Sequence, residues 1–227
     1  MSVIGSNKAL LAATAGASVG GGWDLANAAY NGSPVNWFYV GAQEPSPTGF
    51  FFKPDGTKMY VVGSNGDAVF EYSLSSAWDI TTASYVQNFS VGAEETLPQS
   101  VFFKDDGTKM YVMGIAGDDV NEYSLSSAWD ITTASYVQRF VVSTQETNPT
   151  GVFFKSDGTK MYVVGSTGDD VNEYSLSSAW DVSTASYVQN FSVAAQATLP
   201  RDLFFKDDGT KMYIVDSVGD AVFSYDL

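Results

Sequence analysis

Apolar residues in this chain come in short runs separated by polar turns rich in Gly, Asp, Asn and Ser. The runs at 49–53 and 58–62 contain few polar positions, which predicts strands buried on both faces. A third run at 68–72 predicts another strand, and the segment 85–91 alternates apolar and polar residues. Alternation is typical of a strand with one exposed face. This stretch therefore predicts three inner strands and one outer strand.

The same pattern then repeats. The segment Phe-Lys-x-Asp-Gly-Thr-Lys-Met-Tyr occurs four times, with its glycine at Gly56, Gly107, Gly158 and Gly209, so that successive copies are 51 residues apart. A unit of this size cannot bury its apolar face alone, so neighbouring units must stack. Units with buried inner strands and a half-exposed outer strand are typical of propeller blades. The sequence predicts an all-β fold, a four-bladed β-propeller of four-stranded antiparallel blades.

The two ends of the sequence complement each other. The last unit stops at Leu227, after its third predicted strand. Matching sequence for the missing part occurs near the N-terminus, where Trp23-Asp24-Leu25 corresponds to Trp180-Asp181-Val182 and residues 35–40 correspond to 188–193. We expect this N-terminal outer strand to complete the last blade and close the ring, which removes two open sheet edges.

The predicted organisation is an N-terminal linker or extension over 1–22 and a single propeller over 23–227. Small residues and the run Gly20-Gly21-Gly22 favour a flexible linker. Self-closure predicts a monomer, alone or as part of a larger assembly. The alternative is a dimer that closes one eight-bladed ring, because four blades require steep angles between neighbours.

The repeated residues resemble a known class of propeller. The run Asp-Gly-Thr-Lys-Met-Tyr-Val-Val-Gly, followed by Gly-Asp-x-Val and Tyr-Ser-Leu, is similar to YVTN-type and lactonase-like β-propeller repeats over the stretch from Trp23 to Leu227. Such near-identical blades also resemble those of bacteriophage or marine-bacterial surface and tail-associated proteins. The resemblance implies a propeller on a virion or an extracellular surface. It says little about activity, since propellers serve as enzymes, lectins and scaffolds alike.

The composition excludes several kinds of chemistry. The sequence has no His and no Cys, which excludes Ser-His-Asp and Cys-His catalysis and zinc-thiolate sites. A formal charge of -15 disfavours binding to nucleic acid, and no apolar run is long enough to insert into a membrane. Near-identical blades also place like groups in like environments, whereas a catalytic acid and base need unlike ones. These points favour a protein without catalytic activity over an enzyme, and the enzyme hypothesis stays open.

Acidic residues gather on one face of the predicted ring. The loops after the second and fourth strands hold twelve acids and one base, Arg201, so this face carries -11 of the total -15. The acids are Glu44, Asp67, Glu94, Glu95, Asp118, Asp119, Glu146, Asp169, Asp170, Asp202, Asp216 and Asp220.

Two pairs on this face, Asp118-Asp119 and Asp169-Asp170, are candidate calcium ligands, and calcium or another ion is a candidate occupant of the central channel. The alternative is that Gly-Asp sequences simply form turns with solvated carboxylates. Asp202 and Asp216 break the fourfold symmetry in the last unit.

The Trp-Asp pairs are the second candidate site. They are Trp78-Asp79, Trp129-Asp130 and Trp180-Asp181, with a further copy at Trp23-Asp24. A sugar ring can stack on an indole while the carboxylate accepts hydrogen bonds from its hydroxyls, and several copies give avidity. The alternative is that Trp packs between blades and Asp caps the turn that follows.

These observations predict a non-catalytic binding or structural module, a phage or cell-surface adhesive domain whose ligand is a glycan or a protein. The competing hypothesis is a calcium-dependent, lactonase-like hydrolase at the acidic channel mouth, in which Asp202 and Asp216 make one blade different from the rest. A third hypothesis is a scaffold without a small ligand.

Overall fold

The computed structural model describes residues 37–227 and contains four antiparallel sheets that follow one another along the chain. Blade 1 consists of β1 (Pro47–Phe52), β2 (Lys58–Gly63), β3 (Ala68–Leu74) and β4 (Ala83–Ser90). Blade 2 consists of β5 (Pro98–Phe103), β6 (Lys109–Gly114), β7 (Asp119–Leu125) and β8 (Ala134–Val141). Blade 3 consists of β9 (Pro149–Phe154), β10 (Lys160–Gly165), β11 (Asp170–Leu176) and β12 (Ala185–Ser192). Blade 4 contains β13 (Pro200–Phe205), β14 (Lys211–Asp216) and β15 (Ala221–Asp226).

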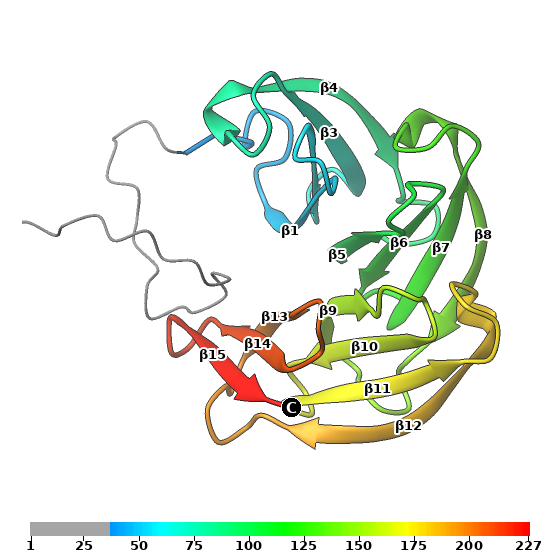
Figure 1. The fold of residues 1–227 in the computed structure, drawn as a ribbon, viewed down its shortest axis with the longest axis vertical. Coiled ribbons are helices and arrows are strands. Elements are labelled where there is room, and N and C mark those ends of the chain that lie inside the picture. Colours follow the sequence, from blue (N-terminus) through cyan, green and yellow to red (C-terminus); the bar gives the residue numbers. More distant parts are fainter. Residues whose placement is uncertain (1–36) are drawn as a thin grey trace, which may run out of the picture. The chain divides into compact units, whose positions relative to one another are not determined.

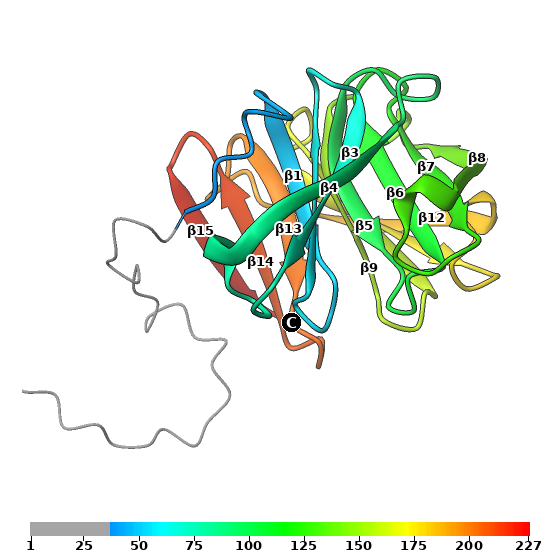
Figure 2. The same cartoon turned by 90° about the horizontal axis from the view of Figure 1, so that it is seen from above.

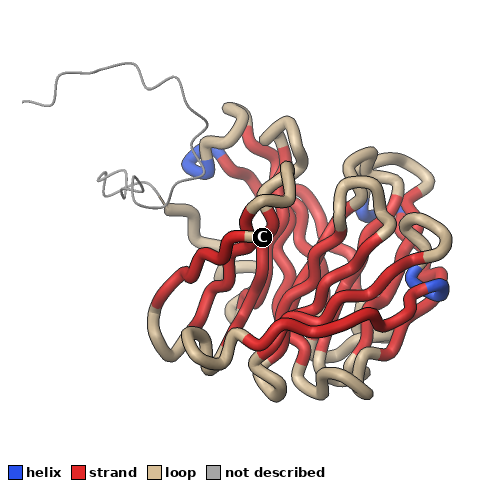
Figure 3. Tube along the Cα trace, turned by 60° about the horizontal axis from the view of Figure 1, so that its bottom comes forward, coloured by secondary structure: helices blue, strands red, loops and turns tan. Residues whose placement is uncertain are grey.

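The first strands of the blades, β1, β5, β9 and β13, lie toward a common centre, and β4, β8 and β12 lie at the rim (Figure 1). Each blade is twisted, so that β4 crosses β1 at a wide angle when seen from above (Figure 2). Three short 3₁₀ helices, η2 (Ile80–Thr82), η3 (Ile131–Thr133) and η4 (Val182–Thr184), lie at the periphery (Figure 3). The predicted four-bladed, all-β propeller is confirmed, and the strands fall within a few residues of their predicted bounds.

The repeated Gly in the first hairpin is required for two reasons. Gly56 has φ 72°, a left-handed conformation that glycine adopts without strain. A Cβ atom there would also lie 2.4 Å from the indole of Trp78, which covers the hairpin. Trp78 itself has φ 65°, and its amide donates to the carbonyl of Gly56 at 2.9 Å. The same arrangement recurs in blades 2 and 3, so the hairpin and the indole form one unit.

Successive blades pack through this indole. Trp129 of blade 2 stacks on Phe103 of its own blade and on Phe51 and Tyr60 of blade 1, with ring centroids 5.6 to 6.4 Å apart. The Tyr60 hydroxyl donates to the Trp129 carbonyl at 2.8 Å across the interface. Because the next interface repeats these contacts with Tyr111 and Trp180, one set of side chains joins all neighbouring full blades.

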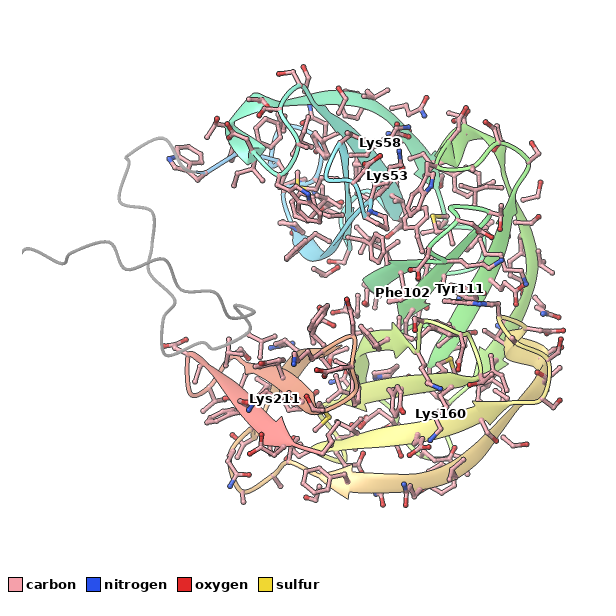
Figure 4. All side chains as sticks on the ribbon, viewed as in Figure 1. Lys53, Lys58, Phe102, Tyr111, Lys160 and Lys211 are labelled. Carbon is pink, nitrogen blue, oxygen red and sulfur yellow. The ribbon has the colours of Figure 1, made fainter. Side chains whose placement is uncertain are left out.

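A polar cluster closes the outer part of each interface. Lys58 forms an ion pair with the buried Glu71 at 2.6 Å and also donates to the Trp129 carbonyl at 3.0 Å. Gln87 donates to Glu71 and, across the interface, to Asp130. Lys58, and Tyr111 from the following interface, are among the side chains marked in Figure 4. Since the buried carboxylate has several partners, this ion pair fixes the register of neighbouring blades.

A buried carboxylate also holds the loops between blades. The side chain of Glu95 accepts hydrogen bonds from the amides of Leu97, Ala116 and Gly117 at 2.7 to 3.3 Å. It lies against Gly114, where a Cβ atom would come within 2.2 Å of the carboxyl carbon. Glu44 with Gly63 and Glu146 with Gly165 repeat this pair in blades 1 and 3.

Blade 4 supplies the same carboxylate from the end of its second strand, β14, instead of from the loop. Ala197 stands where the other blades have Glu, and Asp216 stands where they have Gly. Asp216 accepts from the amides of Leu199, Val218 and Gly219, which are equivalent to the three amides that Glu95 binds in blade 2. These backbone hydrogen bonds, with that of Gly219 the largest, lower the pKa of the Asp216 carboxyl. The difference at Asp216 thus preserves the loop structure.

The predicted strand that completes blade 4 falls mostly outside the described residues, as do the extension over 1–22 and the Trp23-Asp24 pair. Residues 37–40 are not in a strand, and the described part of blade 4 has three strands. Phe38 nevertheless packs edge-on against Tyr72 at 5.3 Å, as Phe89 does against Tyr123 at 5.7 Å. The proposed sequence equivalence therefore holds at Phe38, while ring closure stays a prediction.

We expect Trp129→Ala to lower the free energy of unfolding by about 3–5 kcal/mol, because it leaves a cavity between blades 1 and 2. Tyr136→Ala, at a half-exposed rim position, is the matched control and should cost less than about 1.5 kcal/mol. Chemical denaturation followed by circular dichroism measures both. Equal losses for the two variants would contradict the packing role of Trp129.

The role of the Glu–Gly pair can be tested by placing the carboxylate at position 114, at the end of β6, where blade 4 has Asp216 at the equivalent position. Glu95→Ala should destabilise the protein by about 2–4 kcal/mol, since buried amides lose their acceptor. Gly114→Asp should also destabilise it, because two carboxylates then compete for one space. The double variant should regain most of the loss in a denaturation-based double-mutant cycle. If the losses of unfolding free energy in the two single variants simply add in the double variant, Asp216 does not replace the Glu side chain in blade 4.

Candidate functional site

The structure places the indoles of the predicted glycan site at the blade interfaces. Trp129 and Trp180 are each only 8% exposed and stack against rings of the preceding blade. Trp78 differs, because the residue is 59% exposed. The packing alternative therefore describes Trp129 and Trp180, while Trp78 is the one of these three tryptophans with a ring face open to a partner.

The Asp residue of each pair caps a 3₁₀ helix. The carboxylate of Asp130 accepts from the amide and the hydroxyl of Thr132 at 3.1 and 2.7 Å, and Gln87 donates to it from blade 1. These hydrogen bonds, that of the Thr132 hydroxyl foremost, lower the pKa of Asp130. Asp181 has the equivalent partners Ser183 and Gln138, and Asp79 caps η2. Internal partners thus occupy these carboxylates.

The predicted calcium ligands are divided between two environments. Asp119 is fully buried and accepts from Asn121 at 2.6 Å and from Arg139 at 3.2 Å. Asp170 is also buried and accepts from Asn172 and Asn190. The hydrogen bonds from Arg139 and Asn190 join neighbouring strands of one blade, and those from Asn121 and Asn172 lie within one strand.

Asp118 and Asp169 instead take the left-handed position of the turn, at φ 46° and 47°. Desolvation is the largest cause that raises the pKa of both carboxyls. In the part of the chain that the structure describes, no three acidic side chains gather in a group able to hold a metal ion. The calcium hypothesis stays a prediction.

The acidic face of the ring is less open to solvent than its sequence indicates. Four of its twelve acids, Glu44, Glu95, Glu146 and Asp216, are at most 2% exposed and bind backbone amides. The partners of these four buried carboxylates are backbone amides of the protein itself and not a bound cation. The charges that remain available for steering a ligand are correspondingly fewer than the sequence indicates.

Asp202 is a side chain of the acidic face with a strongly raised pKa. It occupies the β13 position that is Gly49, Ser100 and Gly151 in the other blades. Burial raises the pKa of Asp202 to about 7, against one lowering hydrogen bond from the Leu203 amide. It lies beside β9, where a Cβ atom on Gly151 would come within 2.5 Å of its Oδ1 atom. A carboxyl that titrates near neutral pH is suited to proton transfer.

The sequence analysis did not identify the rim as a surface of interest. Tyr85, Tyr136 and Tyr187 stand at one equivalent position of β4, β8 and β12, and each is 42 to 44% exposed. Each ring packs edge-on against a buried tyrosine of its own blade, at 5.8 to 5.9 Å. An exposed Val follows each Tyr. The available signal was the Tyr-Val pair in every predicted outer strand.

None of the described helices is long and apolar enough to cross a membrane. A scan against protein-family models gives no match, and a search of curated protein sequences gives none either.

Solved structures do match, at low sequence identity. A candidate 6-phosphogluconolactonase from Bacteroides uniformis is 13% identical with a TM-score of 0.57, over 79% of this chain and 50% of that chain. The periplasmic gluconolactonase of Pseudomonas aeruginosa is 15% identical with a TM-score of 0.51, over 78% and 48%. Hydrazine synthase of Kuenenia stuttgartiensis is 17% identical with a TM-score of 0.55, over 88% and 49%.

The chain thus spans about half the length of the structures it matches. Proteins of such different names share only the arrangement of blades at these identities. The likeness includes lactonase-like propellers, as the sequence resemblance implied, and gives no support for a phage or marine origin. What these comparisons establish is the β-propeller fold.

Proposed function

We propose that the protein is a non-catalytic binding module that attaches to a repeated ligand, a glycan of a cell or virion surface, through its rim. The observation that carries the proposal is the row of half-exposed tyrosines Tyr85, Tyr136 and Tyr187, which recur at one position of successive blades. A ligand with repeating units can contact several of them at once, and linked weak contacts give avidity.

The rim tyrosines are held ready for such contacts. Each ring is oriented by its edge-on partner, Tyr72, Tyr123 or Tyr174, so little side-chain entropy is lost when a ligand binds. A tyrosine offers an apolar face for a sugar ring and a hydroxyl for its polar groups. The carboxylates that recur with the repeat accept hydrogen bonds from hairpins, loops and neighbouring blades, which supports a structural rather than a catalytic role for them.

Replacement of Tyr85, Tyr136 and Tyr187 together by Ala should lower glycan binding by at least about tenfold, because each site adds to avidity. Single replacements should have smaller effects. Leu97→Ala, an equally exposed loop position, is the control. A glycan array probed with and without calcium measures binding, and calcium dependence would implicate the acidic loops. Absence of any bound glycan, or full binding by the triple variant, contradicts the proposal.

The second candidate is a lactonase, favoured by one specific observation. Asp202 has a pKa of about 7 and no equivalent acid in the other blades, which supplies the asymmetry that a general base requires. Structures of similar fold include proteins named as lactonases. Deprotonated Asp202 would take a proton from the water that attacks the lactone carbonyl.

If Asp202 is that base, hydrolysis of 6-phosphogluconolactone should rise with pH through about 7, as its carboxyl loses the proton. Asp202→Asn should then lower the rate of hydrolysis at least about 100-fold while the fold is retained. Both expectations are measured as initial rates of lactone hydrolysis, from which the rate of spontaneous hydrolysis is subtracted. No rate above background in the unchanged protein excludes this candidate.

A further inference from the structure

Every interface between blades is made from the same two surfaces. At the first interface, blade 1 contributes Tyr60, Val62 and Val69, which we call the tail face. Blade 2 contributes a head face, which includes Phe103 and Trp129. The next interface repeats this arrangement, with Tyr111, Met113 and Val120 as the tail face of blade 2 and with Val152, Phe154 and Trp180 as the head face of blade 3. A head face and a tail face are therefore complementary wherever they meet.

The row of blades leaves one of each surface exposed. On the head face of blade 1, Phe50 is 64% and Trp78 is 59% exposed, whereas the equivalent Val101 and Trp129 are 3% and 8% exposed. On the tail face of blade 4, Val215 is 38% and Val222 is 51% exposed. Their equivalents Val62 and Val69 are fully buried. Side chains that are core elsewhere in the repeat thus lie at the surface at both ends.

The head face of blade 1 is hollow. A cavity of about 310 Å³ opens there, and its lining residues include Phe38, Phe50, Met59, Val61 and Ile80. In the first interface, the apolar tail-face side chains Val62 and Val69 pack against the equivalent part of blade 2. Val215 and Val222 have the size and polarity to fill the blade 1 cavity in the same way.

Polar groups on the two surfaces match as well. The Trp129 carbonyl accepts from Tyr60 at 2.8 Å and from Lys58 at 3.0 Å. On the head face of blade 1 the equivalent acceptor is the Trp78 carbonyl. Tyr213 and Lys211 stand at the equivalent positions of blade 4, where Tyr213 is 8% exposed and Lys211 forms an ion pair with Asp226 at 2.7 Å. The polar residues of the two surfaces thus match in sequence those of the other interfaces.

We propose that a second copy of this chain docks its tail face on this head face, so that two copies join head to tail into one ring of eight blades. The four blades superpose on half of propeller chains about twice as long, so their curvature is that of a larger ring. Apolar side chains of both surfaces are exposed within one chain, Phe50 and Trp78 at one end and Val215 and Val222 at the other. Burial of such apolar area favours association.

Docking also brings a partner to the open edge of blade 4. Phe38 and Val40 lie on blade 1 as Phe89 and Val91 lie on blade 2, and the amide of Glu44 donates to the Val40 carbonyl as that of Glu95 does to Val91. Residues 37–40 of one copy therefore come to lie beside β15 of the other. In the described residues this edge has no fourth strand, and pairing there would satisfy its backbone groups.

The test is the mass of the full chain in solution, measured by light scattering after size exclusion. One copy has a mass of 24.3 kDa, so two copies give 48.6 kDa. Phe50→Glu and Val222→Glu each place a charge in the joint and should weaken the dimer at least about 100-fold. Val137→Glu, at a rim position of similar exposure, should remain dimeric. Circular dichroism confirms that each variant is folded.

A mixture of the two variants separates this proposal from other dimers. Each variant keeps one intact surface, so Phe50→Glu and Val222→Glu should associate with each other although neither associates with itself. The unchanged chain remaining monomeric at high concentration overturns the proposal, and so does a folded Val222→Glu dimer. A series of larger species overturns the two-copy ring, since head-to-tail contacts that do not close form open arrays.

Discussion

The fit of one blade face on the next is the constraint on which this structure depends. A single blade has a buried tyrosine, a stacked indole and a glycine hairpin, but its apolar side chains become core only when another blade covers them. The indole of Trp129 links these parts, since it covers the hairpin of its own blade and stacks on two rings of the preceding one. Stability in such an array is mainly a sum of nearest-neighbour terms.

The fold was predictable because the repeat carries it four times. Period, apolar runs and the Asp-Gly turn predicted the strands and the blades, and the left-handed glycine is at Gly56 as a tight hairpin requires. The left-handed conformation of Trp78 was not predictable, since a bulky residue rarely adopts it. It exists because the indole covers the Gly56 hairpin and lies against Phe52, and because its amide reaches the Gly56 carbonyl, which are tertiary contacts.

The candidate sites were harder to predict because charge in a sequence carries no information about burial. Glu95 lies in a loop between strands, where an acid is ordinarily solvated, yet three backbone amides enclose it. Asp119 was counted as a calcium ligand, and its carboxylate is buried against Asn121 and Arg139. In each case a partner distant in sequence decides the role. The exposed rim tyrosines became noticeable only once their equal exposure in successive blades was known.

The exchange of Glu and Gly for Ala197 and Asp216 has a consequence for how the repeat can change in number. A recombination event between two near-identical units keeps every loop carboxylate if it exchanges both positions of the pair together. If the crossover falls between them, one hybrid blade receives Ala with Gly and has no acceptor for its loop amides. The reciprocal blade receives Glu with Asp, and two carboxylates then occupy one space. Recombination between blade 4 and another blade therefore keeps this loop only if the crossover lies outside the stretch from 197 to 216 and its equivalent, whereas blades 1 to 3 share the same pair and can recombine within it.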